Sequence, residues 1–284
     1  MELSTISYLK DAIDSNDILR FSLLLELTDE KDVDSLHSTF NNQSLLIYLA
    51  TKCQAEMISV LLGKGANPNV CDPYGWTALH FAIECDADLQ IIEALLKAGA
   101  SPNILPYTQN NPATAVINRN DVTALRVLLD NGMCVEGTDS HQWTLLHHAC
   151  LQGKKDCMEV LLEYGADIYA KTDKGWTTLH FASASEESTA PECVRMLLER
   201  GADPNCLSQS SRTPLHLVVT SGVPLSAEVL LAHGASLDST NKDGKTPLQE
   251  AQVSDRIALI DTFNRYKRQY KLVTVDSRSI LVGG

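Results

Sequence analysis

The nine residues YGWTALHFA at positions 74–82 return as KGWTTLHFA at positions 174–182, with two substitutions. A catalytic motif rarely needs two copies in one chain, whereas a repeated structural unit does, so further copies are expected at fractions of this 100-residue separation. The stretches TLLH (144–147), TPLH (213–216) and TPLQ (246–249) continue the series, and NPAT (111–114) fills the remaining gap. From Thr77 onward the intervals are 34, 33, 33, 36 and 33 residues, so the sequence is periodic.

A second series of residues has the same period. A glycine follows each Leu-Leu run, at Gly65, Gly99, Gly132, Gly165, Gly201 and Gly234. The C-terminus of a helix favours a residue that adopts positive φ without steric cost, and glycine does so. Within a unit, Thr begins a first helix, and Gly153 or Gly222 separates that helix from a second one. Each unit is therefore predicted to be helix, turn, helix and a hairpin-like connection.

The recurring Thr-Pro-Leu-His start and Leu-Leu-x-x-Gly end resemble the ankyrin repeat over roughly residues 40–263. The resemblance implies an all-α solenoid of stacked helix-turn-helix units joined by β-hairpin-like loops. Residues 1–38 are then predicted to be N-terminal capping helices, and residues 39–263 to be six full repeats and a C-terminal capping repeat. Residues 264–284 are basic and then apolar, and we expect them to form a flexible or truncated tail.

Two units depart from the pattern. SLLIYLA (44–50) replaces the usual helix start, and NPATAV (111–116) lacks its histidine. The segment SASEESTAPEC (183–193) holds the three additional residues of the 36-residue interval. We expect a longer loop between paired helices there, and a phosphorylatable loop is the functional alternative.

Composition narrows the class of partner. The formal charge of −13 argues against nucleic acid, because phosphate binding depends on clustered Lys and Arg. Eight cysteines without CxxC pairs, in a chain without the apolar region of a signal peptide, suggest reduced thiols and a cytoplasmic or nuclear location. The longest strongly apolar stretch, SLLIYLA, is far shorter than the ~20 residues that cross a bilayer.

The histidines do not suggest catalysis. His80, His147, His180 and His216 recur at one repeat position, and a single catalytic or metal site would not need four copies. The resemblance implies that these imidazoles bond the backbone of neighbouring units. His147, His148 and Cys150 could be half of a zinc site, but no second Cys/His pair completes it. Phosphate-binding glycine motifs, HExxH and GxSxG are also missing, so we predict no enzyme, no cofactor and no metal.

Three asparagines are candidates for modification. Asn69, Asn103 and Asn205 follow the glycine of their units, each with a leucine eight residues earlier. The resemblance implies that such asparagines can be substrates of an asparaginyl hydroxylase. The alternative is an Asn that hydrogen-bonds its own turn.

The resemblance also implies a concave groove, built from loop tips and first helices, where a partner protein or extended peptide binds. Trp76, Trp143 and Trp176 share the position before the motif threonine, which faces the groove in the family; packing against a neighbouring loop is the alternative. The other groove positions hold Tyr74, Glu84, Tyr107, Arg119, His141, Gln152, Lys174, Arg212 and Lys245. Acidic residues dominate positions 1–40 and basic ones gather at 171–245, so an extended peptide with polarised charge would suit this groove.

We therefore predict a non-catalytic protein–protein interaction module, a scaffold or adaptor whose partner the sequence leaves open. The first alternative is the substrate-recognition subunit of a ubiquitin ligase of the SOCS-box type, although no Leu-Cys-rich box follows Phe263. The second is the regulatory ankyrin part of a larger enzyme, which would require a catalytic domain beyond Gly284.

Overall fold

The computed structural model describes residues 3–27, 43–107 and 111–279, with side chains described between residues 7 and 269 of these ranges. The chain divides into two compact units, unit 1 from Met1 to Asp139 and unit 2 from Ser140 to Gly284. Residues 28–38 of the predicted cap and 280–284 of the predicted tail lie outside the described residues. The regular elements of the described ranges are helices, which confirms the all-α prediction, and an isolated antiparallel bridge joins Lys171 to Thr177.

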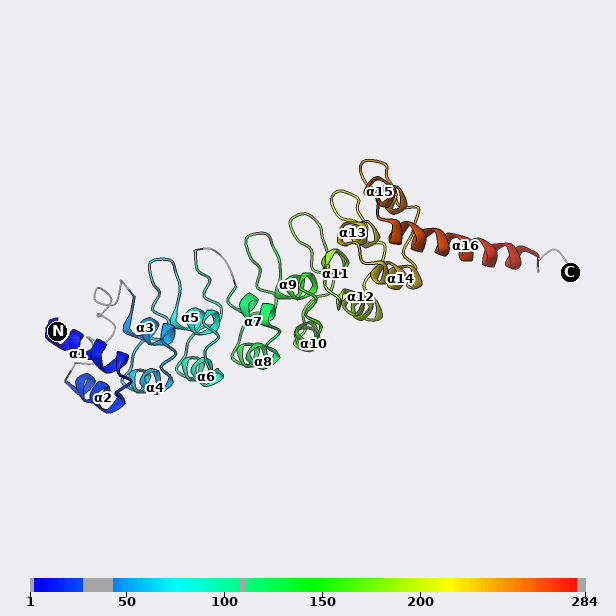
Figure 1. Cartoon of the computed structure of the whole chain (residues 1–284). Coiled ribbons are helices and arrows are strands. Elements are labelled where there is room, and N and C mark those ends of the chain that lie inside the picture. Colours follow the sequence, from blue (N-terminus) through cyan, green and yellow to red (C-terminus); the bar gives the residue numbers. More distant parts are fainter. Residues whose placement is uncertain (1–2, 28–42, 108–110, 280–284) are drawn as a thin grey trace. The chain divides into compact units, whose positions relative to one another are not determined.

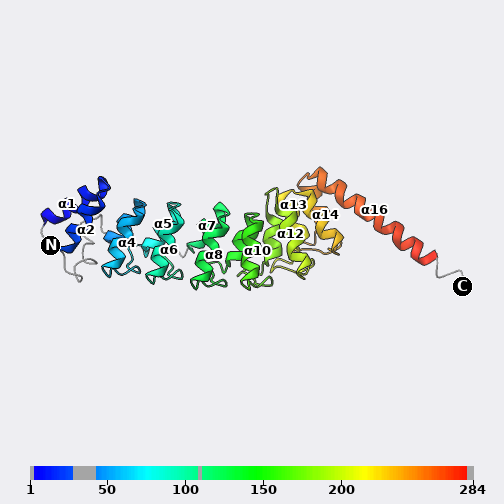
Figure 2. The same ribbon diagram turned by 90° about the horizontal axis from the view of Figure 1, so that it is seen from below.

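The described part of unit 1 contains four pairs of helices (Figure 1). Their bounds are α1 Leu3–Asp14, α2 Ile18–Glu26, α3 Leu45–Thr51, α4 Ala55–Gly63, α5 Ala78–Glu84, α6 Leu89–Lys97, α7 Ala113–Arg119 and α8 Val122–Asp130. The first helices α3, α5 and α7 pack in order on one another. The second helices α2, α4, α6 and α8 form a parallel row, which can be followed in Figure 2.

The described part of unit 2 repeats this arrangement. Its helices are α9 Leu145–Leu151, α10 Lys155–Glu163, α11 Thr178–Ala184, α12 Ala190–Glu199, α13 Pro214–Ser221, α14 Pro224–Ala232, α15 Pro247–Val253 and α16 Ile257–Ser279. The first row is α9, α11, α13 and α15, and the second row is α10, α12, α14 and α16. The additional residues of the 36-residue interval lie between α11 and α12, as the sequence predicts, while phosphorylation of that loop stays a prediction.

Helix α6 shows why these segments form helices. The Asp88 side chain accepts a hydrogen bond from the backbone of Gln90 and begins the helix. The helix then buries Ile91, Ile92, Leu95 and Leu96, and each fully buried aliphatic side chain contributes about 1.5–3 kcal/mol. Gly99, with φ of 92°, turns the chain after the helix.

Five first helices begin with the same reciprocal cap. The threonine side chain accepts from the backbone of the third helical residue, whose side chain accepts from the threonine backbone. The pairs are Thr77–His80, Thr144–His147, Thr177–His180, Thr213–His216 and Thr246–Gln249. Helix α7 begins differently: the Asn111 side chain accepts from the backbone of Ala113 at 2.9 Å, which replaces the cap that its sequence lacks.

The described chain is helical across the boundary predicted between residues 263 and 264. Helix α16 continues from Ile257 to Ser279, a stretch that contains no Gly or Pro to end it. The Tyr266 hydroxyl donates to the carbonyl of Leu231 at 2.7 Å and holds the helix against α14. The boundary between residues 263 and 264 therefore falls inside a helix.

Candidate functional site

The loops that precede the first helices lie on one side of each unit (Figure 1), and backbone hydrogen bonds connect neighbouring loop tips. In unit 1, the backbone N–H of Tyr107 donates to the carbonyl of Tyr74 at 3.0 Å. In unit 2, the Gln209 N–H donates to the Lys174 carbonyl at 3.0 Å, and the Lys242 N–H donates to the Ser210 carbonyl at 3.1 Å. Successive tips therefore form a connected backbone surface within each unit.

Asparagine side chains make a second set of bonds between successive repeats. The Asn69 amide donates to the carbonyl of Gly99 at 2.9 Å, and its oxygen accepts from the backbone of Ser101 at 2.7 Å. Asn103 bonds Gly132 and Cys134 in the same way, and Asn205 bonds Gly234 and Ser236. The alternative that these side chains bond their own turns is wrong, because the amide nitrogen and the amide oxygen of each side chain both bond backbone of the following repeat. Their hydroxylation stays a prediction.

An aromatic cavity lies among the loops of unit 2. The Phe181 side chain, from α11, is only 2% exposed. Its ring centroid lies 4.6 Å from that of Trp143 and 5.5 Å from that of Trp176, with edge-to-face geometry in both pairs. Both indoles are half-buried: they pack on Phe181 of α11, and part of each ring stays accessible. Packing against a neighbouring loop, the alternative from the sequence, stays a prediction. The cavity beside them measures about 260 Å³ and is lined by His141, Trp143, Thr172, Asp173, Lys174, Trp176 and Phe181.

The capping histidine of α11 is held in its neutral form. Its Nδ1 accepts from the Thr177 backbone at 3.2 Å, so its Nε2 carries the proton and donates to the Arg212 carbonyl at 3.0 Å. Burial is the main cause that lowers the pKa of His180 to about 4, and the nearby charges of Lys171 and Arg212 lower it further. The bond to Arg212 joins two repeats, as the resemblance implies. His216 does the same with the carbonyl of Lys245 at 3.1 Å.

Unit 1 holds two exposed tyrosines at its loop tips. Tyr74 is 69% exposed and Tyr107 is 80% exposed, both at predicted groove positions. Trp76 is half-buried, and its ring lies 5.6 Å from that of His80 and 5.4 Å from that of Phe81, all within one repeat. Trp76 and the unit 2 tryptophans belong to different units, so the predicted row of three indoles stays a prediction.

Two further predicted positions lie at the ends of first helices in unit 1. Glu84 is the exposed last residue of α5. Arg119 forms an ion pair and a hydrogen bond within unit 1. Its Nε lies 3.0 Å from an Asp86 carboxylate oxygen, and its Nη2 donates to the Ile83 carbonyl at 2.8 Å. Arg119 therefore links α7 to the end of α5.

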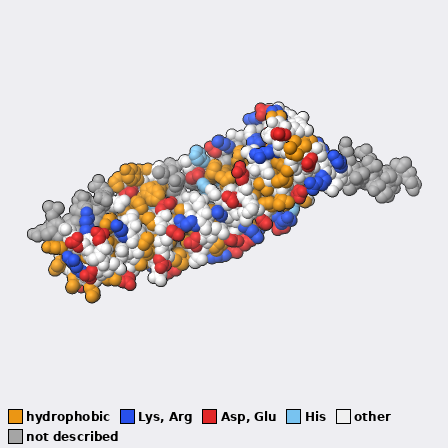
Figure 3. Space-filling model, in the orientation of Figure 1, with side chains coloured by type: hydrophobic (Ala, Val, Ile, Leu, Met, Phe, Trp, Pro, Cys, Tyr) orange, Lys and Arg blue, Asp and Glu red, His pale blue; other side chains and the backbone are white. Residues whose placement is uncertain are grey.

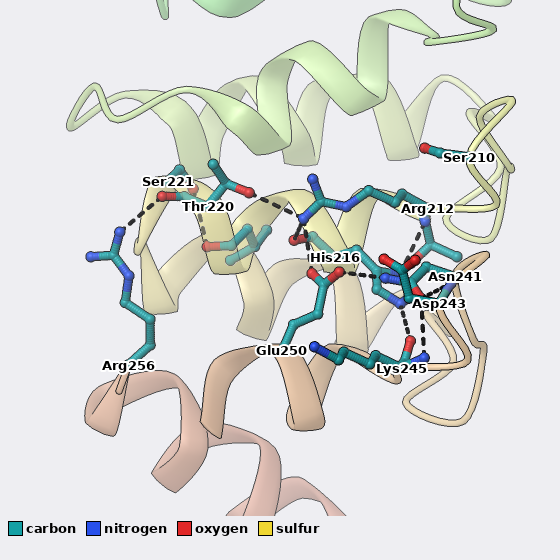
Figure 4. A network of polar contacts seen from close by, with 12 residues as sticks. Ser210, Arg212, His216, Thr220, Ser221, Asn241, Asp243, Lys245, Glu250 and Arg256 are labelled. Carbon is teal, nitrogen blue, oxygen red and sulfur yellow. Dashed lines mark hydrogen bonds and ion pairs between the residues drawn. The ribbon is translucent and has the colours of Figure 1, made fainter. Parts of the chain in front are cut away.

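Arg212, at a predicted groove position, is half-buried and forms an ion pair. Its Nη2 lies 2.8 Å from a Glu250 carboxylate oxygen and also donates to the His216 carbonyl at 3.1 Å (Figure 4). Its side chain is 26% exposed and lines a cavity. Lys245, on the second of these loops, is exposed, and Gln152 is the half-buried C-cap of α9.

The structure adds residues to the candidate site that the sequence does not single out. Phe181 belongs to the repeated nine-residue stretch, so its position was visible although its role was not. Glu250, from α15, pairs with Arg212, and Asn241, from the loop before α15, donates to Glu250; no spacing rule in the sequence marks either residue. On the face seen in Figure 3, Lys and Arg are interspersed with Asp and Glu over each unit. An excess of one sign of charge is therefore sought in the lining of individual cavities.

The geometry of the repeats agrees with comparisons to known proteins. The family model for ankyrin repeats matches residues 9–106, 105–172 and 179–264. The chain belongs to the ankyrin-repeat family. The ankyrin-repeat structure of human ASB11 superposes with a TM-score of 0.67 and 26% sequence identity, covering 78% of this chain and 98% of that one.

Two human relatives are much longer than the region matched. SH3 and multiple ankyrin repeat domains protein 2 from Homo sapiens is 30% identical over 245 residues, which are 84% of this chain and 13% of that protein. Transient receptor potential cation channel subfamily A member 1 from Homo sapiens is 25% identical over 228 residues, which are 78% of this chain and 18% of that protein. The matched residues are less than a fifth of each relative, so the similarity concerns one part of each protein and not its whole activity.

Within the described ranges, no cluster of three or more His, Cys, Asp or Glu side chains is arranged to hold a metal ion. None of the helices in the described part of the chain combines the length and apolarity needed to cross a membrane.

Proposed function

We propose that this ankyrin-repeat chain is a non-catalytic protein-binding module, and that unit 2 takes an apolar or aromatic side chain of a partner segment into the aromatic cavity. The observation that supports this is the pair of half-buried indoles, Trp143 and Trp176, beside a cavity with a buried aromatic wall. Tryptophan combines a large apolar surface with a polar N–H, which is why it often anchors protein interfaces.

The size of the cavity favours a side chain over a whole small molecule. Its volume of about 260 Å³ is below the ~300–1,000 Å³ typical of ligand pockets. Exposed His141, Asp173 and Lys174 surround the aromatic wall and supply a polar rim. An apolar centre with a polar rim is the usual anatomy of a protein interface.

Random dodecapeptides displayed on phage provide the test, because they presuppose no partner. Selection on the full chain should enrich peptides with a Trp, Phe or Leu at one position. A synthetic peptide from this set should bind the wild-type chain and lose at least about thirty-fold in affinity to Trp176→Ala, as expected for an interface anchor worth ~2 kcal/mol.

A second variant separates binding from folding. Trp176→Ala also removes a contact with Phe181 and should lower the melting temperature. His141→Trp instead adds bulk at an exposed lining residue and should fill the cavity with the fold retained. Glu199→Trp, at the exposed end of α12, is the matched control. If His141→Trp remains folded and binds the peptide as well as the wild type does, this proposal is wrong.

The two alternatives from the sequence stay predictions. A ubiquitin-ligase subunit and a regulatory part of a larger enzyme would both use the same protein-binding surface. One human relative is an SH3 and multiple ankyrin repeat domains protein and the other is a cation channel subunit, and each is far longer than its matched region. Affinity capture with the full-length gene product, followed by mass spectrometry, would distinguish these settings.

A further inference from the structure

A second cavity of unit 2 lies between the loops that precede α13 and α15 and the beginning of α16. It measures about 670 Å³. Its charged lining residues are the four cations Arg212, Lys242, Lys245 and Arg256 and the two anions Asp243 and Glu250. This excess of positive charge is local, because the chain as a whole carries a formal charge of −13.

The carboxylate of Glu250 is already engaged. One of its oxygens lies 2.8 Å from Arg212 Nη2, and the other accepts from the Asn241 side chain at 2.6 Å. Arg212 Nη2 also donates to the Thr220 hydroxyl at 3.2 Å, so this guanidinium is fixed as a wall of the cavity (Figure 4). Arg212 and Glu250 compensate each other, and Glu250 cannot also neutralise the exposed lysines.

Hydrogen bonds fix the backbone of the loop that carries the exposed lysines. The Asn241 side-chain oxygen accepts from the backbone of Asp243 at 2.9 Å and of Lys245 at 3.0 Å, which fixes the loop that carries Lys242 and Lys245. Arg256 Nη2 donates to the Thr220 carbonyl at 3.0 Å and lies at the cavity edge. Three solvent-exposed cations therefore surround a preformed opening, with Asp243 the remaining carboxylate among its charged lining residues.

We propose that this basic cavity binds the carboxylates of an acidic peptide segment, in the same partner chain whose apolar side chain enters the aromatic cavity. This inference rests on the proposed function for its apolar anchor. Trp176 and Arg212 occupy corresponding loops of successive repeats, and Lys245 lies on the loop after that. Stacked helices are ~10 Å apart, so these loops lie one to two such steps from Trp176. An extended chain rises ~3.3 Å per residue, which places the acidic residues about three to six positions from the anchor.

The experiment uses the dodecapeptides selected on the full wild-type chain. They should carry Asp or Glu about three to six positions from the apolar anchor. The affinity of one such synthetic peptide should fall about tenfold or more in the double variant Lys242→Glu, Lys245→Glu, and should weaken as salt is added. Replacing the acidic residues of the peptide by Gln or Asn should produce a similar loss in the wild-type chain.

Matched controls separate this cavity from general electrostatics and from the proposed function. Arg195→Glu with Arg200→Glu makes the same change of charge at exposed positions of α12 and of its C-cap, in the same unit, and should leave affinity nearly unchanged. If the lysine variant binds normally while His141→Trp does not, the acidic-segment inference is overturned and the aromatic anchor stands. If the lysine variant loses binding and His141→Trp does not, the two-point arrangement proposed here is overturned. If the α12 control loses as much affinity as the lysine variant, the effect is one of net charge and the basic cavity is not the site.

Discussion

The two copies of the nine-residue stretch have the same local structure and different surroundings. Both place glycine at positive φ, tie the loop tip to the next repeat and cap the helix with a Thr–His pair. At 174–182, Trp143 of the preceding repeat joins Trp176 around a buried Phe181. At 74–82, the corresponding preceding position holds Gln43, and Phe81 is half-buried. A cavity therefore depends on the neighbouring repeat, although the motif itself is the same.

The largest expected difference between the copies is in their phenylalanines. Phe181→Ala should lower the free energy of unfolding by about 3–5 kcal/mol, because it empties a buried aromatic site. Phe81→Ala should cost only about 1–2 kcal/mol, since a half-buried ring loses less burial. Urea unfolding followed by circular dichroism would measure both. Equal losses in the two variants would show that the surroundings of the copies do not differ energetically.

The capping histidines should make stability depend on pH. The pKa of His180 is lowered to about 4 in the folded state, from an unfolded value near 6.5. As the pH falls, the unfolded state therefore binds this proton before the folded state does. The contribution of neutral His180 to the free energy of unfolding is complete above pH ~6.5 and is lost as the pH falls to about 4. The total loss is about 3 kcal/mol. Urea unfolding at a series of pH values would show the loss.

Glutamine provides the control for this titration. Gln249 already occupies the same capping position in α15, where its oxygen accepts from the Thr246 backbone at 2.9 Å. His180→Gln should keep the cap and remove this part of the pH dependence. His80→Gln should remove a smaller part, because Asp72 opposes the lowering of the His80 pKa by burial. A wild-type pH profile in His180→Gln would contradict the assignment.

The bridging asparagines should cost the same in both units. Asn69→Ala and Asn205→Ala each remove two hydrogen bonds to the next repeat, and each should lower the free energy of unfolding by about 1–3 kcal/mol. Asn118→Ala, at an exposed position of α7, is a control for loss of an Asn side chain. A large difference between Asn69→Ala and Asn205→Ala would mean that the bridges are not equivalent.

The smallest expected effect concerns the glycines of the two copies. Gly75 and Gly175 have φ of 84° and 70°, and a Cβ on either would lie 3.1 Å from backbone of the next loop. Gly75→Ala and Gly175→Ala should each lower the free energy of unfolding by about 1 kcal/mol, the lower end of the cost of a left-handed non-glycine residue. Thermal unfolding would compare the melting temperatures of the two variants. If only one variant is destabilised, the loop contact in the other copy is less tightly packed.

The sequence predicts the structural features that recur among the repeats, but it does not predict the contacts that form between repeats. The Thr–His caps and the Leu-Leu-x-x-Gly ends follow from local rules, so helix starts and the all-α fold were predictable. The pairing of Arg212 with Glu250 and of Arg119 with Asp86 joins residues one repeat or more apart, and no local rule selects them. The end of the last helix was misplaced because a change in composition at residue 264 is not a helix stop.

The asparagine bridges also identify natural reporters of motion. The backbone amides of Ser101, Cys134 and Ser236 donate their protons to an asparagine oxygen of the preceding repeat. Such an amide can exchange its hydrogen with solvent only after that oxygen moves away, whether or not the helices themselves remain folded. Deuterium uptake at these three amides would therefore record how often adjacent repeats separate from each other, one junction at a time.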